Sequence, residues 1–356
     1  GKVLSATDFG LHPIGTGPFR FREWKDDGTI ILEADHDYHE GRPCLDKIVV
    51  KTYPDSERLW LALMRGEVDC VEFINRRDYE ILKEDPTFKA YAFAVDGYYA
   101  LRYVLSDPVV SDKRIREALE RAIDADFLIR RVEGGYGVPA SGPFWPGSLG
   151  FSPDMKAPAY DPEKARALLR EAGWQDSNKD GIFDKDGRDL ELRVLFDERY
   201  GTYEKLVMAL RQQLQEAGIK LKAAAYRDDS SLTEDFFREN GIQVVLTFLF
   251  GGGDPDQEAE DWSPAASEKV KRLWGYDDPE VDRLFGRGRV TQDQEERRKI
   301  YQEIGRRIAA DKPACFLYYP YVFHGIASRF EGTDAYFCVN MPNYLIKDFH
   351  SERQQN

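Results

Sequence analysis

Residues 176–187, DSNKDGIFDKDG, combine the side-chain types and the spacing of a calcium-binding loop. Oxygen ligands at alternate positions and a glycine at the sharp turn suit Ca²⁺, and Gly181 supplies that turn. The twelfth position departs from the pattern, because Gly187 stands where such loops carry a bidentate glutamate. The candidate ligands all carry side-chain oxygen: Asp176, Asn178, Asp180 and Asp184, with Asp184 or Asp189 as the substitute for the missing glutamate. A structural calcium ion is one interpretation. The other is a solvated turn closed by its own Asx side chains, and no further cofactor is predicted.

Motifs that would carry catalysis are missing from the sequence. It contains no G-x-S-x-G nucleophile elbow, no H-E-x-x-H zinc site and no G-x-x-x-x-G-K-[ST] phosphate loop. The five histidines are few for acid–base chemistry; His36 and His39 share a polar turn, and His324 is expected to be buried beside an apolar strand. We therefore predict that the protein is not an enzyme. A calcium-bearing hydrolase is the alternative from another class, without a visible nucleophile–base arrangement.

Aromatic side chains are frequent, with 19 Tyr, 21 Phe and 6 Trp. Several stand next to predicted Gly/Pro loops and strand ends: Phe144, Trp145, Tyr200, Phe248, Phe250, Trp262, Trp274 and Tyr276. Core packing explains most aromatic residues in any protein, but those that flank such loops fit a concave binding cleft equally well. The aromatic excess therefore indicates a binding cleft near those loops.

Charge and composition narrow the classes of partner. The 356 residues carry 50 Lys+Arg and 64 Asp+Glu, a net charge of −14, which argues against a nucleic-acid backbone or an anionic membrane surface as partner. No run approaches about 18 apolar residues, so no membrane-spanning helix is predicted. The cysteines lie far apart without C-x-x-C spacing, which gives no support to zinc or redox chemistry: Cys44, Cys70, Cys315 and Cys338. Cys70 and Cys315 are expected to be buried thiols, and disulfide pairing stays open.

The elements that position these residues follow from hydrophobic periodicity. Residues 14–53 are predicted to form short strands with a hairpin turn at Asp27-Gly28, and the apolar stripe over 112–133 predicts a helix. Strand and helix patterns alternate between 189 and 250, which is typical of βαβ units with a largely parallel sheet. Such sheets bind ligands beyond the carboxyl ends of their strands. In this chain those ends are residues 197–200 and 250–255.

Nine segments along nearly the whole chain carry a resemblance to a known family. They are HPIGTGPFRFREW (12–24), DYHEGRPCLDKIVVK (37–51), LALMRGEVD (61–69), SDKRIREALERAID (111–124), GVPASGPFWPG (137–147), YDPEKARALLREAGW (160–174), GGDPD (252–256), GYDDPEVDRL (275–284) and ADKPACFLYY (310–319). Each is modest alone, but nine in one order are specific. Together they resemble the periplasmic peptide/nickel class of ABC-transporter solute-binding proteins, the dipeptide- and oligopeptide-binding group.

The resemblance implies an α/β fold of the periplasmic binding protein type (type II, cluster C), with mixed sheets flanked by helices. Residues 1–103 would be the returning part of lobe I, residues 104–318 lobe III, and residues 319–356 the return to lobe I. A fragment is expected, because the first strands of lobe I and the small lobe II would precede Gly1. A signal segment would precede it too, so the resemblance implies a periplasmic or lipid-anchored cell-surface protein.

The resemblance also places ligand contacts at two strand ends. In relatives that bind free peptides, an aspartate three residues before the GDPD aspartate pairs with the ligand's α-amino group. That position is Gly251 here, and a tryptophan three residues further back is Phe248. Asp254 is the candidate to supply the charge instead, with a turn role before Pro255 as the alternative. Arg199 lies near the place of a carboxylate-binding arginine. The expected contacts are Phe248, Phe250, Gly251, Asp254, Arg199, Tyr200, Phe144 and Trp145.

We therefore expect the solute-binding component of an ABC importer, which closes two lobes on a peptide-like or other small polar solute. The missing carboxylate at position 251 argues against a dipeptide. A nickel chelate, heme or an oligosaccharide bound by the same fold is the alternative within this class. The expected partners are the solute and the membrane permease of the transporter, without nucleic acid, and the protein is expected to be a monomer.

Overall fold

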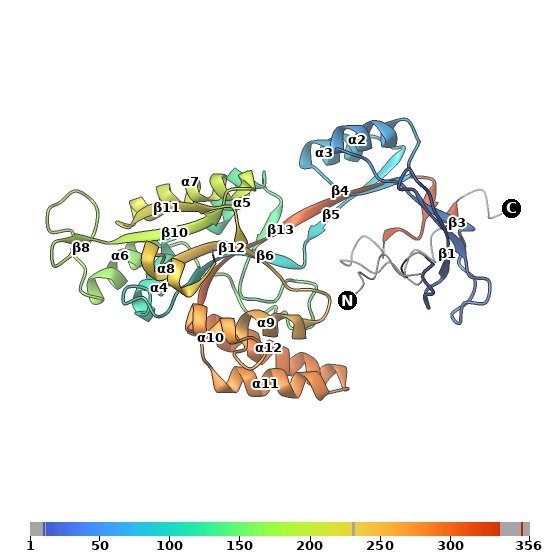
Figure 1. Cartoon of the computed structure of the whole chain (residues 1–356). Helices are drawn as coiled ribbons and strands as arrows, with labels where there is room; N and C mark the ends of the chain where they lie inside the picture. Colours follow the sequence, from blue (N-terminus) through green and yellow to red (C-terminus); the bar gives the residue numbers. More distant parts are fainter. Residues whose placement is uncertain (1–9, 11, 230–231, 335–349, 352–356) are drawn as a thin grey trace. The chain divides into compact units, whose positions relative to one another are not determined.

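The computed structural model describes residues 10, 12–229, 232–334 and 350–351. The chain divides into two compact units, unit 1 with residues 1–93 and 322–356 and unit 2 with residues 94–321 (Figure 1). The lobe boundaries expected after residues 103 and 318 both fall inside unit 2. The strand that ends at residue 103 therefore belongs with the elements that follow it, and the lobe assignment itself stays a prediction.

Unit 2 is built on a mixed sheet with the strand order β11, β10, β12, β6, β13. β10 pairs in parallel with β11 and β12, whereas β6 pairs antiparallel with β12 and with β13. The bounds are β6 Gly97–Tyr103, β10 Glu191–Asp197, β11 Lys220–Tyr226, β12 Val244–Phe250 and β13 Ala314–Ala327, with β7 (Gly137–Pro139) beside β13. The parallel pairing predicted for the alternating region is thus confirmed, and the sheet as a whole is mixed because β6 and β13, which come from outside that region, pair antiparallel.

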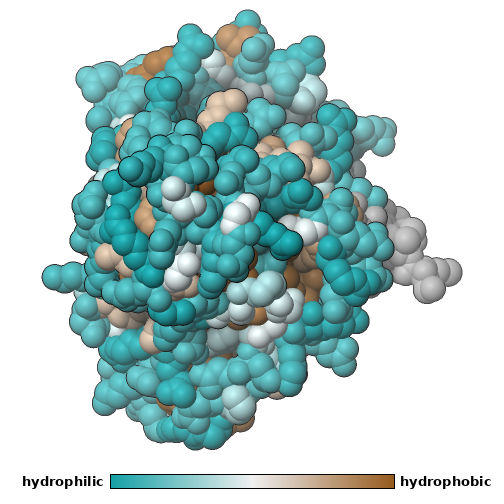
Figure 2. All heavy atoms as spheres, turned by 90° about the vertical axis from the view of Figure 1, so that its left-hand side faces the viewer, coloured by the Kyte–Doolittle hydropathy of each residue, from teal (hydrophilic) through white to brown (hydrophobic). Residues whose placement is uncertain are grey.

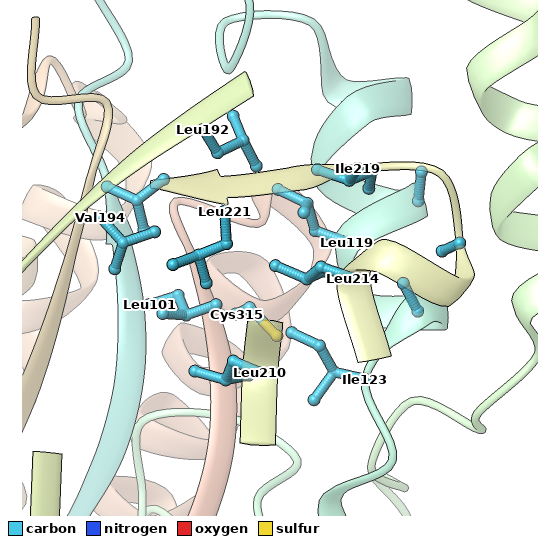
Figure 3. Packing of buried hydrophobic residues seen from close by; sticks show 14 of the residues in the cluster. Leu101, Leu119, Ile123, Leu192, Val194, Leu210, Leu214, Ile219, Leu221 and Cys315 are labelled. Carbon is cyan, nitrogen blue, oxygen red and sulfur yellow. The ribbon is translucent and has the colours of Figure 1, made fainter. Parts of the chain in front are cut away.

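Helices cover both faces of this sheet. On one face lie α4 (Lys113–Ala122), α5 (Ala125–Val132), α6 (Pro162–Glu171) and α7 (Gly201–Glu216), and their apolar side chains meet those of the strands in a core around Leu119, Leu214 and Cys315 (Figure 3). Neighbouring strand residues point to opposite faces, so Tyr98 and Ala100 of β6 enter a second core with Trp262 and Tyr301.

The remaining elements of unit 2 are short or belong to the second core. They are β8 (Asp184–Lys185), β9 (Arg188–Asp189), α8 (Glu234–Asn240), the 3₁₀ helix η3 (Pro255–Glu258), α9 (Ala259–Trp262), α10 (Glu268–Trp274), α11 (Pro279–Val290) and α12 (Gln294–Asp311). The left-hand end of unit 2 in Figure 1 presents a face on which hydrophilic residues predominate and hydrophobic ones form small separate patches (Figure 2). Most of the large apolar side chains of unit 2 are therefore buried inside it, mainly in the two cores.

The single helix predicted over 112–133 is wrong, because the chain breaks it into α4 and α5. Ile123 and Asp124 are extended between the two helices. The Asp124 carboxylate accepts the Phe127 N–H at 2.9 Å, and the Asp124 N–H donates to Gln213 Oε1 at 2.8 Å. An aspartate in this position stabilises the start of a new helix. The amphipathic stripe continues through the break, so hydrophobic periodicity alone does not reveal it.

Unit 1 contains a three-stranded antiparallel sheet of β1 (Phe19–Trp24), β2 (Ile30–Ala34) and β3 (Lys47–Val50). The predicted hairpin is confirmed: the Gly28 N–H donates to the Lys25 carbonyl at 3.0 Å, and Gly28 adopts the positive φ of 83° that such a turn requires. The other elements are α2 (Ser56–Met64), β4 (Cys70–Ile74), α3 (Arg76–Glu84), β5 (Phe88–Ala94), the end of β13, β14 (Phe330–Glu331) and β15 (His350–Ser351).

The cysteines and His324 follow the predictions only in part. Cys315 is buried as expected, but Cys70 is exposed, because it opens β4 and the inward position of that strand is taken by Val71. Cys44 is also exposed, and Cys338 lies outside the described residues. His324 is buried in unit 1 with its ring stacked on Phe93, and burial lowers its pKa to about 4.

The helices can be compared with the length and apolar character of a membrane span. Within the described ranges, none combines the length and the apolar character needed to cross a bilayer.

Candidate functional site

The carboxyl ends of the parallel neighbours β10 and β12 lie at the same edge of the sheet in unit 2, and several predicted contacts gather there. Arg199 follows β10 and is already paired. Its Nε donates to Asp197 Oδ1 at 2.8 Å, and its Nη2 reaches Asp229 Oδ1 at 2.7 Å. The hydrogen bonds from Arg199 hold the pKa of Asp197 below its usual range. Two carboxylates thus occupy the guanidinium, and carboxylate recognition by Arg199 stays a prediction.

Five aromatic side chains form a continuous row at this edge, called here the aromatic row. Tyr99 and Phe248 meet edge to face with ring centroids 5.0 Å apart, and Phe248 meets Phe250 at 4.8 Å. The ring of Tyr203 lies 5.7 Å from Tyr99 and 6.2 Å from Tyr200. Phe250 is 71% exposed and Tyr200 is 59% exposed. The row therefore has two exposed ends, Phe250 and Tyr200, which are joined through the less exposed rings of Phe248, Tyr99 and Tyr203.

Two members of the aromatic row, Tyr99 and Tyr203, were not foreseen from the sequence. Tyr99 comes next to Phe248 because β6 and β12 pair in a register that aligns the two residues. Tyr203 is fixed by its hydroxyl, which accepts the Phe248 N–H at 2.9 Å. Burial raises the pKa of the Tyr203 hydroxyl to about 12, so it stays protonated at neutral pH. Tyr99 and Phe248 are 149 residues apart in the chain, so no local sequence pattern indicates that strand register aligns them.

Gly251 lies immediately after β12 and touches the second core. Its N–H donates to the Asp96 carbonyl at 2.7 Å. A Cβ atom at this position would lie 2.9 Å from Glu258 Oε1 and 3.4 Å from Trp145 Cδ1. The structure therefore brings the predicted contacts Gly251 and Trp145 together, and it adds Glu258, which the sequence did not single out.

Glu258 is a buried carboxyl group with neutral hydrogen-bond partners. Its Oε2 accepts the Tyr98 hydroxyl at 3.0 Å and Trp262 Nε1 at 2.9 Å. Burial, together with the nearby charge of Asp261, raises the pKa of Glu258 well above its usual range. The neighbouring cation, Arg102, is engaged by Asp261 at 2.7 Å. Burial and these neutral partners therefore favour the uncharged form of the Glu258 carboxyl group.

Asp254 caps η3 and holds the glycine loop against a helix. Its carboxylate accepts the Asp256 N–H at 2.8 Å and pairs with Arg297 of α12 at 2.7 Å. Asp256 in turn pairs with Arg289 at 2.8 Å. These bonds account for the GDPD aspartates as structural residues, which is the alternative foreseen for Asp254. A ligand contact by Asp254 stays a prediction.

Phe144 and the calcium-loop residues lie apart from the aromatic row. Phe144 is buried in the second core with its ring against Tyr301, so packing explains its position. Its role as a ligand contact stays a prediction.

The predicted calcium ligands take part in hydrogen bonds of their own loop. Asp184 accepts both the N–H and the hydroxyl of Ser177, at 2.8 and 2.7 Å. The other three candidates each accept a loop N–H: Asp176 from Gly181, Asn178 from Asp180, and Asp180 from Ile182. In the part of the chain that the structure describes, no group of three or more His, Cys, Asp or Glu residues is arranged to hold a metal ion. A calcium ion in this loop stays a prediction.

Comparison with known proteins shows the family. The family of bacterial extracellular solute-binding proteins, family 5 Middle, matches residues 4–266. This chain belongs to that family. The oligopeptide-binding protein AppA of Bacillus subtilis is 30% identical over 323 residues, which are 90% of this chain and 59% of AppA. The dipeptide-binding protein of Escherichia coli is 26% identical over 93% of this chain and 60% of its own length. The family 5 chain therefore spans about three fifths of the length of these relatives.

Solved structures confirm the fold class. The family 5 chain is similar to Bacillus subtilis AppA in complex with a nonapeptide, with a TM-score of 0.67, 27% identity, and coverage of 98% of this chain and 69% of AppA. NikZ from Campylobacter jejuni in complex with Ni(L-His) has a TM-score of 0.70 at 23% identity, over 98% of this chain and 70% of NikZ, and supports the fold alone. The type II periplasmic binding protein fold expected from the motif order is confirmed.

Proposed function

We propose that this chain is part of the extracytoplasmic solute-binding component of an ABC importer. It captures a peptide-like or other small polar solute at the carboxyl ends of β10 and β12 and delivers it unchanged to the transporter's membrane permease. Family membership supports the class of function, and the relatives include oligopeptide-, dipeptide- and glutathione-binding proteins. A hinge closure of two lobes over the solute is the mechanism that fits this class.

The observation that carries the proposal is the open end of the aromatic row. Phe250 and Tyr200 expose their rings at the sheet edge where α/β folds bind ligands. The ring of Phe248 packs against Phe250, and the ring of Tyr203 packs against Tyr200. A rigid exposed aromatic ring gives a solute a large contact area at a low entropic cost. Arg199, whose guanidinium carbon lies 5.9 Å from the centre of the Tyr200 ring, is paired with Asp197 and Asp229. The edge is thus suited to a solute held by ring contacts and neutral hydrogen bonds.

Ligand-dependent thermal shift of the full-length natural protein tests the proposal. The panel contains peptides of two to nine residues, a nickel–histidine chelate, heme and cello-oligosaccharides. A true solute binds the native state and raises the melting temperature by several degrees. Chemical turnover of a panel member, or a panel without any shift, would contradict the proposal.

A matched pair of variants locates the site. Phe250→Ala should weaken binding of the panel member that gives the shift by about tenfold, because it removes the exposed end of the aromatic row. Met208→Ala is the control, since Met208 is 68% exposed on α7 and makes no part of the row. Equal affinities of the two variants would place the solute elsewhere.

A further inference from the structure

Two buried polar atoms without hydrogen-bond partners among the described residues belong to side chains that lie beside Gly251. They are Oε1 of Glu258, a side chain with 1% exposure, and Nε1 of Trp145, a side chain with 8% exposure. The Cβ position of Gly251 lies 2.9 Å from Glu258 Oε1 and 3.4 Å from Trp145 Cδ1, the carbon bonded to Nε1. A methyl group at position 251 would crowd Glu258 Oε1, so this position favours glycine. Buried polar atoms are nearly always paired in native proteins, so the pair calls for a partner.

The protonation of Glu258 defines what that partner can be. Its Oε2 already accepts two hydrogen bonds, from Tyr98 and from Trp262. Both donors are neutral, and the carboxyl group is shielded from water, so the proton of the acid belongs on Oε1. Oε1–H of Glu258 and Nε1–H of Trp145 are then two donors beside one glycine. Two donors are complementary to an oxygen acceptor, whereas an ammonium group offers donors only.

We propose that Glu258 Oε1 and Trp145 Nε1 form a subsite at Gly251 for an uncharged oxygen of the solute, a hydroxyl or a carboxamide carbonyl. The inference rests on the proposed function and specifies the class of solute that the site accepts. It replaces the recognition of a charged amine, for which position 251 has no side chain, with recognition of a neutral group. The same chemistry can come from a blocked or internal peptide amide or from a sugar hydroxyl.

Isothermal titration calorimetry with three probes separates these sources. The probes are tetra-alanine amide with a free amino terminus, the same peptide with an acetylated amino terminus, and cellotetraose. The two peptides differ only in the charge and the carbonyl at one end. We expect either the acetylated peptide or cellotetraose to bind at least tenfold more tightly than the free-amine peptide. Tenfold tighter binding of the free-amine peptide would overturn the inference.

Two substitutions test the subsite itself, each with a matched control. Gly251→Ala places a methyl group 2.9 Å from Glu258 Oε1 and should weaken the tightest probe at least tenfold. Gly253→Ala is the control, because a Cβ at Gly253 has no neighbour within 4 Å among the described residues. Trp145→Phe removes the N–H and keeps an aromatic ring, and should weaken the same probe about tenfold. Trp24→Phe makes the same chemical change at a half-exposed position of unit 1.

The indole N–H signal of Trp145 gives a readout that does not depend on affinity. In protein labelled with ¹⁵N-tryptophan, this is the signal that disappears in Trp145→Phe, and it should shift when the tightest probe is added. An unshifted signal, or unchanged affinity in both Gly251→Ala and Trp145→Phe, would overturn the subsite and leave the proposed function standing. Failure of all three probes to bind would overturn both.

Discussion

Unit 2 buries two glutamates in different ways. Glu120 on α4 is 5% exposed and pairs with the ammonium group of Lys312, which follows α12. Glu258 is 1% exposed, accepts hydrogen bonds only from neutral groups, and has one oxygen without a partner in the described ranges. A buried acid with a cation is satisfied by the fold alone. A buried acid with an unused oxygen next to a glycine has capacity left for a ligand. The comparison therefore assigns Glu120 to the stability of the fold and Glu258 to ligand binding.

The largest expected effect comes from breaking the satisfied pair. Glu120→Ala removes the carboxylate from Lys312, a side chain that is only 20% exposed, which should cost about 3–5 kcal/mol in the free energy of unfolding. Glu117→Ala on the same helix is the control, because Glu117 lies 3.9 Å from Lys164 near the surface and its pair is worth at most about 1 kcal/mol. Urea unfolding measures both, and similar losses would show that Glu120 is not held as described.

Glu258→Gln should remove a pH dependence of the free energy of unfolding. Because the pKa of Glu258 is raised in the folded protein, the native state keeps a proton that the unfolded chain loses above about pH 4.5, and native stability falls as pH rises. The variant has no such proton and should gain stability relative to the natural protein, by up to about 1.4 kcal/mol per pH unit. The charged or titratable groups that face Glu258 are Asp261, Arg102, Tyr98 and Tyr319. Melting temperatures at pH 5 and pH 8 that differ equally in the two proteins would refute this.

Asp197→Asn should show the opposite sign. The bonds from Arg199 lower the pKa of Asp197, so its contribution is present above about pH 4 and is lost as pH falls through the lowered value. We expect a loss of about 1 kcal/mol at pH 7, small because Arg199 is 42% exposed, which narrows toward pH 3. Chemical unfolding at the two pH values measures it. A loss that grows on acidification would contradict the pairing.

The smallest expected effect concerns the ion pair between Asp254 of the GDPD segment and Arg297 of α12, called here the GDPD clamp. Arg297→Met removes the partner of Asp254 and should cost less than about 1 kcal/mol, since Asp254 is half exposed. Arg298→Met, at the next position, breaks an exposed helical pair with Glu295 and serves as control. Unfolding curves should show a larger loss for Arg297→Met, together with faster amide exchange of the glycine loop. Unchanged exchange would show that the clamp does not hold that loop.

Local features of the fold could be predicted from the sequence, because their causes are local. Asp161 and Pro162 start α6 with residue types that favour a helix start, and the Asp161 carboxylate accepts the Lys164 N–H at 2.9 Å. The exposed ends of the aromatic row, Tyr200 and Phe250, were found from strand ends and Gly-rich loops. The break at Asp124 was missed, because a capping carboxylate interrupts a helix without interrupting its apolar stripe.

The buried part of the candidate site could not be predicted, because it depends on distant contacts. Trp145 and Gly251 stand 106 residues apart, and Glu258 reaches them only after η3 turns the chain back from β12. The sequence around Glu258 reads as an ordinary acidic surface turn. Burial, which gives this glutamate its chemistry, is set by Tyr98 on β6 and Trp262 on α9.

A crystal structure of the full-length natural protein with the tightest member of the solute panel tests the central claim most directly. The account predicts solute atoms in van der Waals contact with Phe250 and an uncharged solute oxygen within hydrogen-bond distance of Glu258 Oε1 and Trp145 Nε1. A solute bound away from the carboxyl ends of β10 and β12, or a charged amine seated against Glu258, would contradict it.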